Sequence, residues 1–222
     1  RQGQSPSMGR VRKPCTRSSI SAQSRETWLL LTPSMPRARA AHPDRRLTLW
    51  FQDGWTYTSN RFGQKGRVCH RWFVRGQRPP GLCDQRCTWA HLFAVVRPAT
   101  GQDFALVSPH VPTAAMSVFL ERFAKTLAED EHAVLVLDRA GWRTAKRLRV
   151  PDSMTLVRLP PYSPDLNLIE RVWLHLRERH LSHRLLDGYE AIADALCQAW
   201  RRLTAERLQS LTSYNYTEQV RI

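Results

Sequence analysis

Ala133-Val134-Leu135-Val136-Leu137-Asp138 joins five consecutive apolar residues to a single acid. A short apolar run without polar alternation is typical of a strand that is covered on both faces, as in parallel pairing. The run is too short to span a membrane, and the chain contains no stretch of about 18 apolar residues. The segment therefore predicts a central buried strand of an α/β sheet, with Asp138 at its carboxyl end.

The segments on either side of this run predict further strands and helices. We expect strands at residues 47–51, 68–74, 89–96, 104–107 and 154–157. We expect helices at residues 113–129, 144–149, 168–180 and 189–203, with a last short helix after them. An apolar stripe at helical spacing should pack on the sheet as core, and its members are Leu166, Ile169, Trp173 and Leu176. Early antiparallel strands followed by strands joined through helices indicate a mixed α/β sheet with helices on its faces. This is also the element order of the ribonuclease-H-like fold.

The charge of the chain predicts a polyanionic partner. The 222 residues include 34 Lys and Arg against 19 Asp and Glu, for a net charge of +15. Such an excess attracts nucleic acid, because binding to phosphates releases counterions. The sequence shows no basic amphipathic helix with a clean apolar face, so we expect DNA rather than a membrane as the partner.

Much of this charge lies in residues 1–46, which hold ten basic and two acidic residues. Ser and Pro are frequent there and apolar periodicity is poor, which predicts a mostly disordered basic arm. Residues 47–222 then form one folded domain. Two interpretations of the arm stay open: it lies on DNA, or it has no function.

The cysteines indicate a reducing compartment. Their number is odd, they are scattered and no secretory signal precedes them, which favours a cytoplasmic protein. Cys83, Cys87 and His91 are spaced by four residues, which leaves a zinc site as a minor alternative. No second tight pair of ligands supports it.

Three acids stand out by position: Asp53 after the first strand, Asp138 after the central strand, and Glu170 in the first turn of a helix. In open α/β sheets, ligands gather beyond the carboxyl ends of strands. Grouped carboxylates need a cation to offset their repulsion, and their hard oxygens favour Mg²⁺ or Mn²⁺. Two such ions can activate a water or a 3′-hydroxyl against a phosphodiester.

Each acid also has a structural alternative on local grounds. Asp53 precedes Gly54 and fits an ordinary turn. Asp138 fits a cap on the turn that follows its strand. Asn167 and Glu170 have the spacing of a helix N-cap and its capping-box partner.

The segment before the third acid carries a specific resemblance. It reads Leu159-Pro160-Pro161-Tyr162-Ser163-Pro164-Asp165-Leu166-Asn167-Leu168-Ile169-Glu170-Arg171-Val172-Trp173. This resembles the signature before the last catalytic acid of bacterial insertion-sequence transposases of the Tc/mariner superfamily, which carry a DDE endonuclease domain. Phe51-Gln52-Asp53 and Leu137-Asp138 look like the first two motifs of that family, and 31 residues separate the second acid from the third.

The resemblance covers about residues 47–222 and implies a DNA transposase catalytic domain with a ribonuclease-H-like fold. It implies that Asp53, Asp138 and Glu170 are the catalytic residues and hold two Mg²⁺ or Mn²⁺ ions. It also implies a homodimer on paired DNA ends, in the bacterial cytoplasm at the nucleoid. Basic residues near the first two acids are candidate phosphate contacts, with a solvated surface as the alternative: Arg61, Lys65, Arg67, Arg143 and Lys146.

The chain departs from the family pattern in three places. Gly54 stands where an acid often follows the first aspartate, Arg143 stands in place of a frequent His, and Leu168 in place of Pro. Residues 1–46 are also too short for the helix-turn-helix domains that read element ends. Three hypotheses therefore stay open: a transposase that cleaves and joins DNA, an inactive DNA-binding remnant, and a nuclease without strand transfer.

Overall fold

The computed structural model describes residues 33–55, 62–63, 88–110, 113–138, 147–160, 166–181, 184 and 186–213. A helix over residues 33–41 comes first. The elements that follow are β1 (Arg46–Trp55), β2 (Phe62–Gly63), β3 (Trp89–Val96), β4 (Asp103–Ser108), α2 (Thr113–Ala124), β5 (Glu131–Leu137), β6 (Met154–Arg158), α3 (Ile169–Leu176), the π-helical turn η3 (Arg177–Leu181), α4 (Gly188–Arg201) and α5 (Ala205–Thr212). The strand expected at 68–74 lies outside the described residues.

The strands form one mixed sheet, six-stranded over the described part of the chain, in the order β2-β3-β1-β5-β6 with β4 also paired to β3. β3 runs antiparallel to β1 and to β4, whereas β1, β5 and β6 run parallel. All seven residues of β5 are buried, which confirms the central strand expected from its apolar run. The ribonuclease-H-like arrangement predicted from the element order is therefore the observed one.

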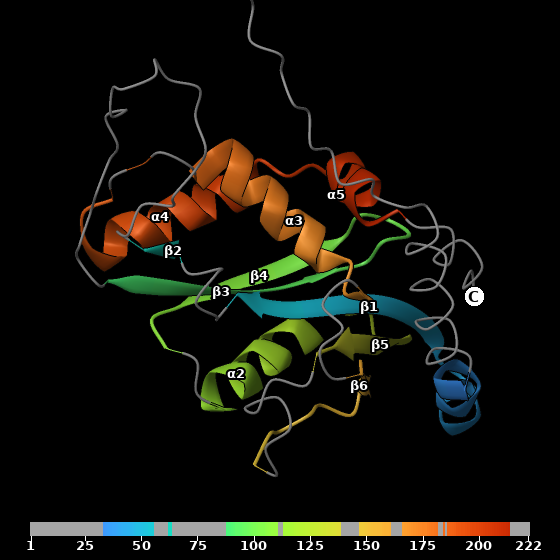
Figure 1. The fold of residues 1–222 in the computed structure, drawn as a ribbon. Coiled ribbons are helices and arrows are strands. Elements are labelled where there is room, and N and C mark those ends of the chain that lie inside the picture. The colour runs from blue at the N-terminus through green and yellow to red at the C-terminus, as the bar shows by residue number, and fades with distance from the viewer. Residues whose placement is uncertain are drawn as a thin grey trace, which may run out of the picture.

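Helices cover both faces of this sheet, so the domain has three layers (Figure 1). One face is covered by α2, where Phe119 and Phe123 pack against Trp50, Phe93 and alternate residues of β5. The aromatic rings interlock, since Trp50 meets Phe123 edge-on with ring centroids 4.9 Å apart. Burial of these large side chains fixes α2 on the sheet.

The opposite face carries α3, α4 and α5 (Figure 1). The stripe expected from helical spacing is buried there: Leu166, Ile169, Trp173 and Leu176 are at most 2% exposed. They pack with alternate residues of β3 and with apolar residues of α4, apart from Leu166, which lies beside β1 and β5. This packing places the first turn of α3 over β1, which matters for the third acid.

Part of the segment that the sequence analysis expected to be disordered is helical. Residues 33–41 are helical, and Met35 and Ala38, three residues apart, pack beside Leu47. Pro33 stands at the first helical position, where its fixed φ and missing N–H are harmless. The expectation of disorder up to residue 46 was therefore wrong for residues 33–46, and residues 1–32 lie outside the described part.

Three boundaries also differ from expectation. β1 continues through Asp53 to Trp55, so Asp53 does not begin a turn. The helix expected at 168–180 ends as an α-helix at Leu176 and continues as the π-turn η3. Of the helix expected at 144–149, residues 147–149 are described and are not helical. No helix in the described residues is long and apolar enough to span a membrane.

Candidate active site

The register of β1 and β5 brings the first two acids to one edge of the sheet. The parallel pairing matches Phe51 with Val136, so Asp53 and Asp138 each lie two residues beyond that pair. Neighbouring strands are about 4.8 Å apart, and residues two apart share a face. Phe51 and Val136 belong to the same apolar cluster, so both acids continue one face of the sheet. That face is the one that α3 covers.

Asp53 is 5% exposed, and α3 holds it in place. Its Oδ2 accepts a hydrogen bond of 2.8 Å from the indole Nε1 of Trp173, and its Oδ1 accepts one of 2.8 Å from the backbone N–H of Gly54. A buried carboxylate is costly without such donors. The aspartate is therefore a fixed group inside the strand, and the turn interpretation was wrong.

A second contact ties the start of α3 to the same strand. Asn167 is 3% exposed, and its Nδ2 donates a 3.0 Å hydrogen bond to the carbonyl oxygen of Gln52. Leu168 is the N-cap residue of α3 and no side chain caps the helix, so the predicted capping role of Asn167 was wrong. Leu168 has φ −60°, the value that proline would impose, and its side chain is buried beside Phe51. The departure from proline is thus accommodated.

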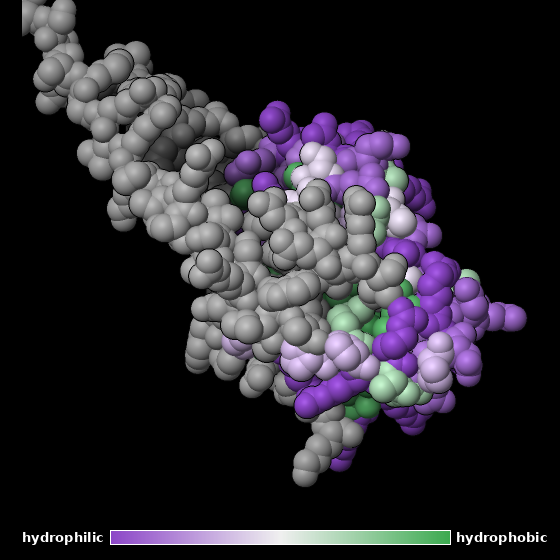
Figure 2. All heavy atoms as spheres, turned by 90° about the vertical axis from the view of Figure 1, so that its right-hand side faces the viewer, coloured by the Kyte–Doolittle hydropathy of each residue, from purple (hydrophilic) through white to green (hydrophobic). Residues whose placement is uncertain are grey.

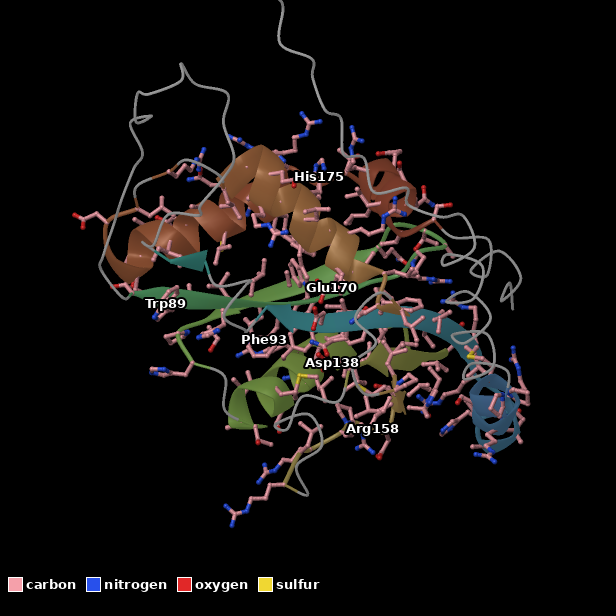
Figure 3. The ribbon with its side chains drawn as sticks, viewed as in Figure 1. Trp89, Phe93, Asp138, Arg158, Glu170 and His175 are labelled. Carbon is pink, nitrogen blue, oxygen red and sulfur yellow. The ribbon has the colours of Figure 1, made fainter. Side chains whose placement is uncertain are left out.

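Glu170 lies between these two anchors. Asn167, Glu170 and Trp173 are spaced by three residues, which keeps them on one side of the helical turn. The outer two bond to Gln52 and Asp53 of β1. Figure 3 shows Glu170 at the end of α3 that meets β1, and Asp138 on the other side of the β1 ribbon in this view. The third acid is therefore directed to the edge that carries the other two.

The described acids do not form a complete metal-binding site. Among the described residues, no three His, Cys, Asp or Glu side chains are grouped closely enough to hold one metal ion. Mg²⁺ usually takes only one or two carboxylates and completes its shell with water and substrate phosphate. The donors present are hard oxygens, so a pair of acids at each ion fits Mg²⁺ or Mn²⁺ chemically.

The other predicted site residues fall outside the description. Arg61, Lys65, Arg67, Arg143 and Lys146 are not among the described residues. The same holds for Cys83 and Cys87 of the zinc alternative, whereas its third residue, His91, is described.

Sequence reasoning missed the roles of Trp173 and Asn167. Trp173 was expected only to fill the core, and Asn167 only to cap the helix. The signal that would have found both is their spacing of three residues on either side of Glu170.

Comparison with known proteins identifies the family. The model of the DDE superfamily endonucleases matches residues 49–193. This chain belongs to that family. A curated protein of Sinorhizobium fredii strain NGR234, named Uncharacterized protein y4pE/y4sA, is 42% identical over 115 residues, which are 52% of this chain and 85% of that protein.

The fold matches solved transposase structures. The Mos1 mariner paired-end complex with Mn superimposes with a TM-score of 0.59 at 14% identity, and the Mos1 strand transfer complex with a TM-score of 0.55 at 16% identity. In both, the match covers 95% of this chain and 62–63% of the Mos1 chain. The chain thus spans less than two thirds of the Mos1 chains, and at this identity the likeness establishes the fold.

Proposed function

We propose that this chain is the catalytic domain of a DNA transposase that cleaves phosphodiester bonds and transfers the cut strand with the help of divalent cations. The observation that supports the proposal is that the first two acids lie near the carboxyl ends of paired parallel strands, and that the helix bearing the third is hydrogen-bonded to the first of them. Asp53 and Asp138 each lie two residues beyond the paired Phe51 and Val136, and the hydrogen bond from Trp173 to Asp53 joins α3, which bears Glu170, to β1.

The roles of the residues follow from their positions. Asp53 and Asp138 would hold the ions from the sheet, and Glu170 would complete the binding from α3. Bound Mg²⁺ or Mn²⁺ supplies Lewis acidity to the phosphate and lowers the pKa of an attacking water or hydroxyl. Trp173 and Gly54 fix both oxygens of Asp53, so this carboxylate is oriented before substrate arrives.

The proposed reaction consists of two successive displacements at phosphorus, first cleavage and then strand transfer. In cleavage, a water oxygen bonds to phosphorus, the bond to the 3′-oxygen breaks, and the freed strand ends in a 3′-hydroxyl. In transfer, that 3′-oxygen bonds to a phosphorus of target DNA and displaces a new 3′-oxygen. We propose that the protein is encoded by a bacterial insertion sequence, that its substrates are the element ends and target DNA, and that two copies act on paired ends. Solved Mos1 structures include a paired-end complex and a strand transfer complex.

A second candidate is a DNA-binding protein that has lost cleavage. It is favoured by the absence of a three-acid group among the described residues and by Gly54, which stands where relatives often have an acid. The net charge of +15 supports DNA binding under either candidate.

A nicking assay separates these candidates. Supercoiled plasmid is incubated with the full chain and Mg²⁺ or Mn²⁺, and conversion to the open-circular form is measured. Asp138→Asn removes one proposed ligand while keeping the side-chain shape. Asp130→Asn is the matched control, because Asp130 lies at the opposite end of β5 with a side chain 64% exposed.

Nicking by the wild type and by Asp130→Asn, with a loss of at least a hundredfold in Asp138→Asn, is the result we expect. Binding of plasmid without nicking by any variant would reject catalysis and support the second candidate. A labelled 3′-hydroxyl duplex then tests transfer, since a nuclease without transfer would cut the plasmid but never join the label to it.

A further inference from the structure

A basic surface lies on the helical layer away from the sheet, and the catalytic proposal does not use it. It is built by the C-terminal end of α3, η3, the end of α4 and the start of α5. We name it the arginine–histidine cap, and its members are His175, Arg179, His180, Arg184, Arg202 and Arg207. In Figure 3, nitrogen-tipped side chains project from this layer around His175.

The π-helical turn creates the centre of the cap. In an α-helix, residues five apart point about 140° away from each other, because each residue turns the chain by about 100°. The turn η3 widens the helix, and the rings of His175 and His180 meet edge-on with centroids 5.7 Å apart. Single π-turns inside α-helices occur frequently at functional sites.

Positive charge from four arginines surrounds the two rings, and it exceeds the charge of Glu178 in the same turn. Arg179, Arg184, Arg202 and Arg207 are exposed, and in the described part of the chain no ion pair joins any of them to a carboxylate. Burial lowers the pKa of His175 and of His180, and nearby arginine charges lower both further, while Glu178 opposes this weakly at His175. The field at the cap is therefore positive and would favour an anion.

The cap and the candidate active site share one continuous helical segment. Arg179 follows Glu170 by nine residues, a rise of about 13 Å at the α-helical value. Successive phosphates of one DNA strand are about 3.4 Å apart along the helix axis, so this length corresponds to about four base pairs. The cap and Glu170 are thus separated along the helix by about the length of four base pairs.

We propose that the arginine–histidine cap is a second DNA-binding surface, which grips the phosphate backbone of the duplex about four base pairs from the candidate active site. The arginine forks suit phosphate oxygens, since each guanidinium offers paired N–H donors in one plane. An acidic protein is the alternative partner for this surface. Membership of the DDE endonuclease family and the shared helix favour DNA. Figure 2 shows that the described surface at the height of α3 and α5 is mostly hydrophilic, as phosphate contact requires.

The test measures binding without cleavage, so it does not depend on the catalytic proposal. The full chain is titrated onto a fluorescein-labelled 30-base-pair duplex in EDTA, and anisotropy gives the affinity at several NaCl concentrations. The cap variant carries Arg179→Gln and Arg207→Gln. The matched control carries Arg122→Gln and Arg149→Gln, which remove the same charge from exposed positions at α2, on the other face of the sheet, and before β6.

Each lost phosphate contact lowers the slope of log affinity against log salt by about 0.9. We therefore expect the cap variant to lose about 1.8 from the slope and about tenfold or more in affinity at 100 mM salt, while the control loses clearly less. Equal slopes for the two variants would overturn the proposal, as would a cap variant that loses binding to an acidic polypeptide but not to duplex. Arg202→Gln, at another exposed position, repeats the test if the double variant melts earlier than the wild type.

Discussion

Trp173→Phe tests whether the hydrogen bond to Asp53 organises the candidate active site. The change keeps an aromatic ring in the core and removes the Nε1–H that donates to Asp53 Oδ2 at 2.8 Å. Both residues are buried, at 1% and 5% exposure, so water cannot replace the lost donor easily. The indole is thus predicted to contribute to stability and to the orientation of the carboxylate at once.

The expected magnitude follows from two losses. A hydrogen bond to a carboxylate contributes about 1.5–3 kcal/mol, and the smaller ring leaves a gap that costs about 1 kcal/mol more. We therefore expect Trp173→Phe to lower the free energy of unfolding by about 3 kcal/mol. Combined with Asp53→Ala in a double-mutant cycle, the coupling energy isolates the hydrogen bond and should be about 2 kcal/mol.

The chain contains a matched control for this experiment. The indole N–H of Trp200, in α4, donates to Oδ2 of Asp103, in β4, and the Trp200 ring packs on that of Trp173 with centroids 5.8 Å apart but makes no bond to Asp53. Trp200→Phe removes the same kind of bond, so it should also destabilise the fold. Urea unfolding gives the stabilities, and the plasmid assay gives the nicking rate of each folded variant.

We expect Trp173→Phe to slow nicking about tenfold or more, with a changed dependence on Mg²⁺ concentration, while Trp200→Phe nicks at the wild-type rate. A coupling energy below about 0.5 kcal/mol between residues 173 and 53 would refute the reasoning. Equal loss of nicking in both tryptophan variants would refute it too, because that loss would then reflect stability alone.

Three further predictions concern stability. Burial lowers the pKa of His132 to about 4, so as the pH falls this histidine binds a proton in the unfolded chain before it does in the folded one. The free energy of unfolding should therefore fall by about 2–3 kcal/mol from pH 6.5 to 4. His132→Phe should flatten this pH dependence in urea unfolding, and an unchanged dependence would contradict the assignment. Gly101 has φ +71°, and a Cβ added there would lie 2.1 Å from the carbonyl oxygen of Ala205. Gly188 has φ +80°, but a Cβ added there would meet no atom within 4 Å. Thermal melts should show a loss of about 3 kcal/mol for Gly101→Ala and about 1 kcal/mol for Gly188→Ala, and equal losses would exclude the steric contact. Gln52 is fully buried, and within the described residues neither its side-chain oxygen nor its side-chain nitrogen has a hydrogen-bond partner. Gln52→Met should therefore raise the free energy of unfolding by about 1 kcal/mol. A lower free energy of unfolding in this variant would show that the amide does have a partner.

The sequence alone predicted those elements that local pattern encodes. The apolar run before Asp138 indicated a buried parallel strand, and β5 is buried throughout. The strand at residues 89–96 was predicted with the bounds it has. The helical stripe through Ile169 and Trp173 was predicted to face the sheet, and it does. Each of these predictions rests on the periodicity of apolar side chains, which can be read from residues close together in the sequence.

Contacts across the chain were beyond such patterns. Asp53 had the local features of a turn, yet it lies inside β1 because pairing with β3 carries the strand two residues further. Asn167 had the spacing of a helix cap, yet it bonds to the carbonyl of Gln52, 115 residues away. The helix at residues 33–41 was hidden in a basic segment, since only Met35 and Ala38 face the core.

The sequence by itself determined that three acids lie near the ends of predicted strands or at the start of a helix, that the chain is strongly basic, and that it resembles a nuclease family. Only the tertiary structure decided that Asp53 and Asp138 each follow the paired Phe51 and Val136 by two residues and that Trp173 reaches Asp53. The physical reason is that periodicity records which way a side chain faces, whereas the atom it meets at 3 Å depends on strand order and helix docking, which the packing of the whole domain sets.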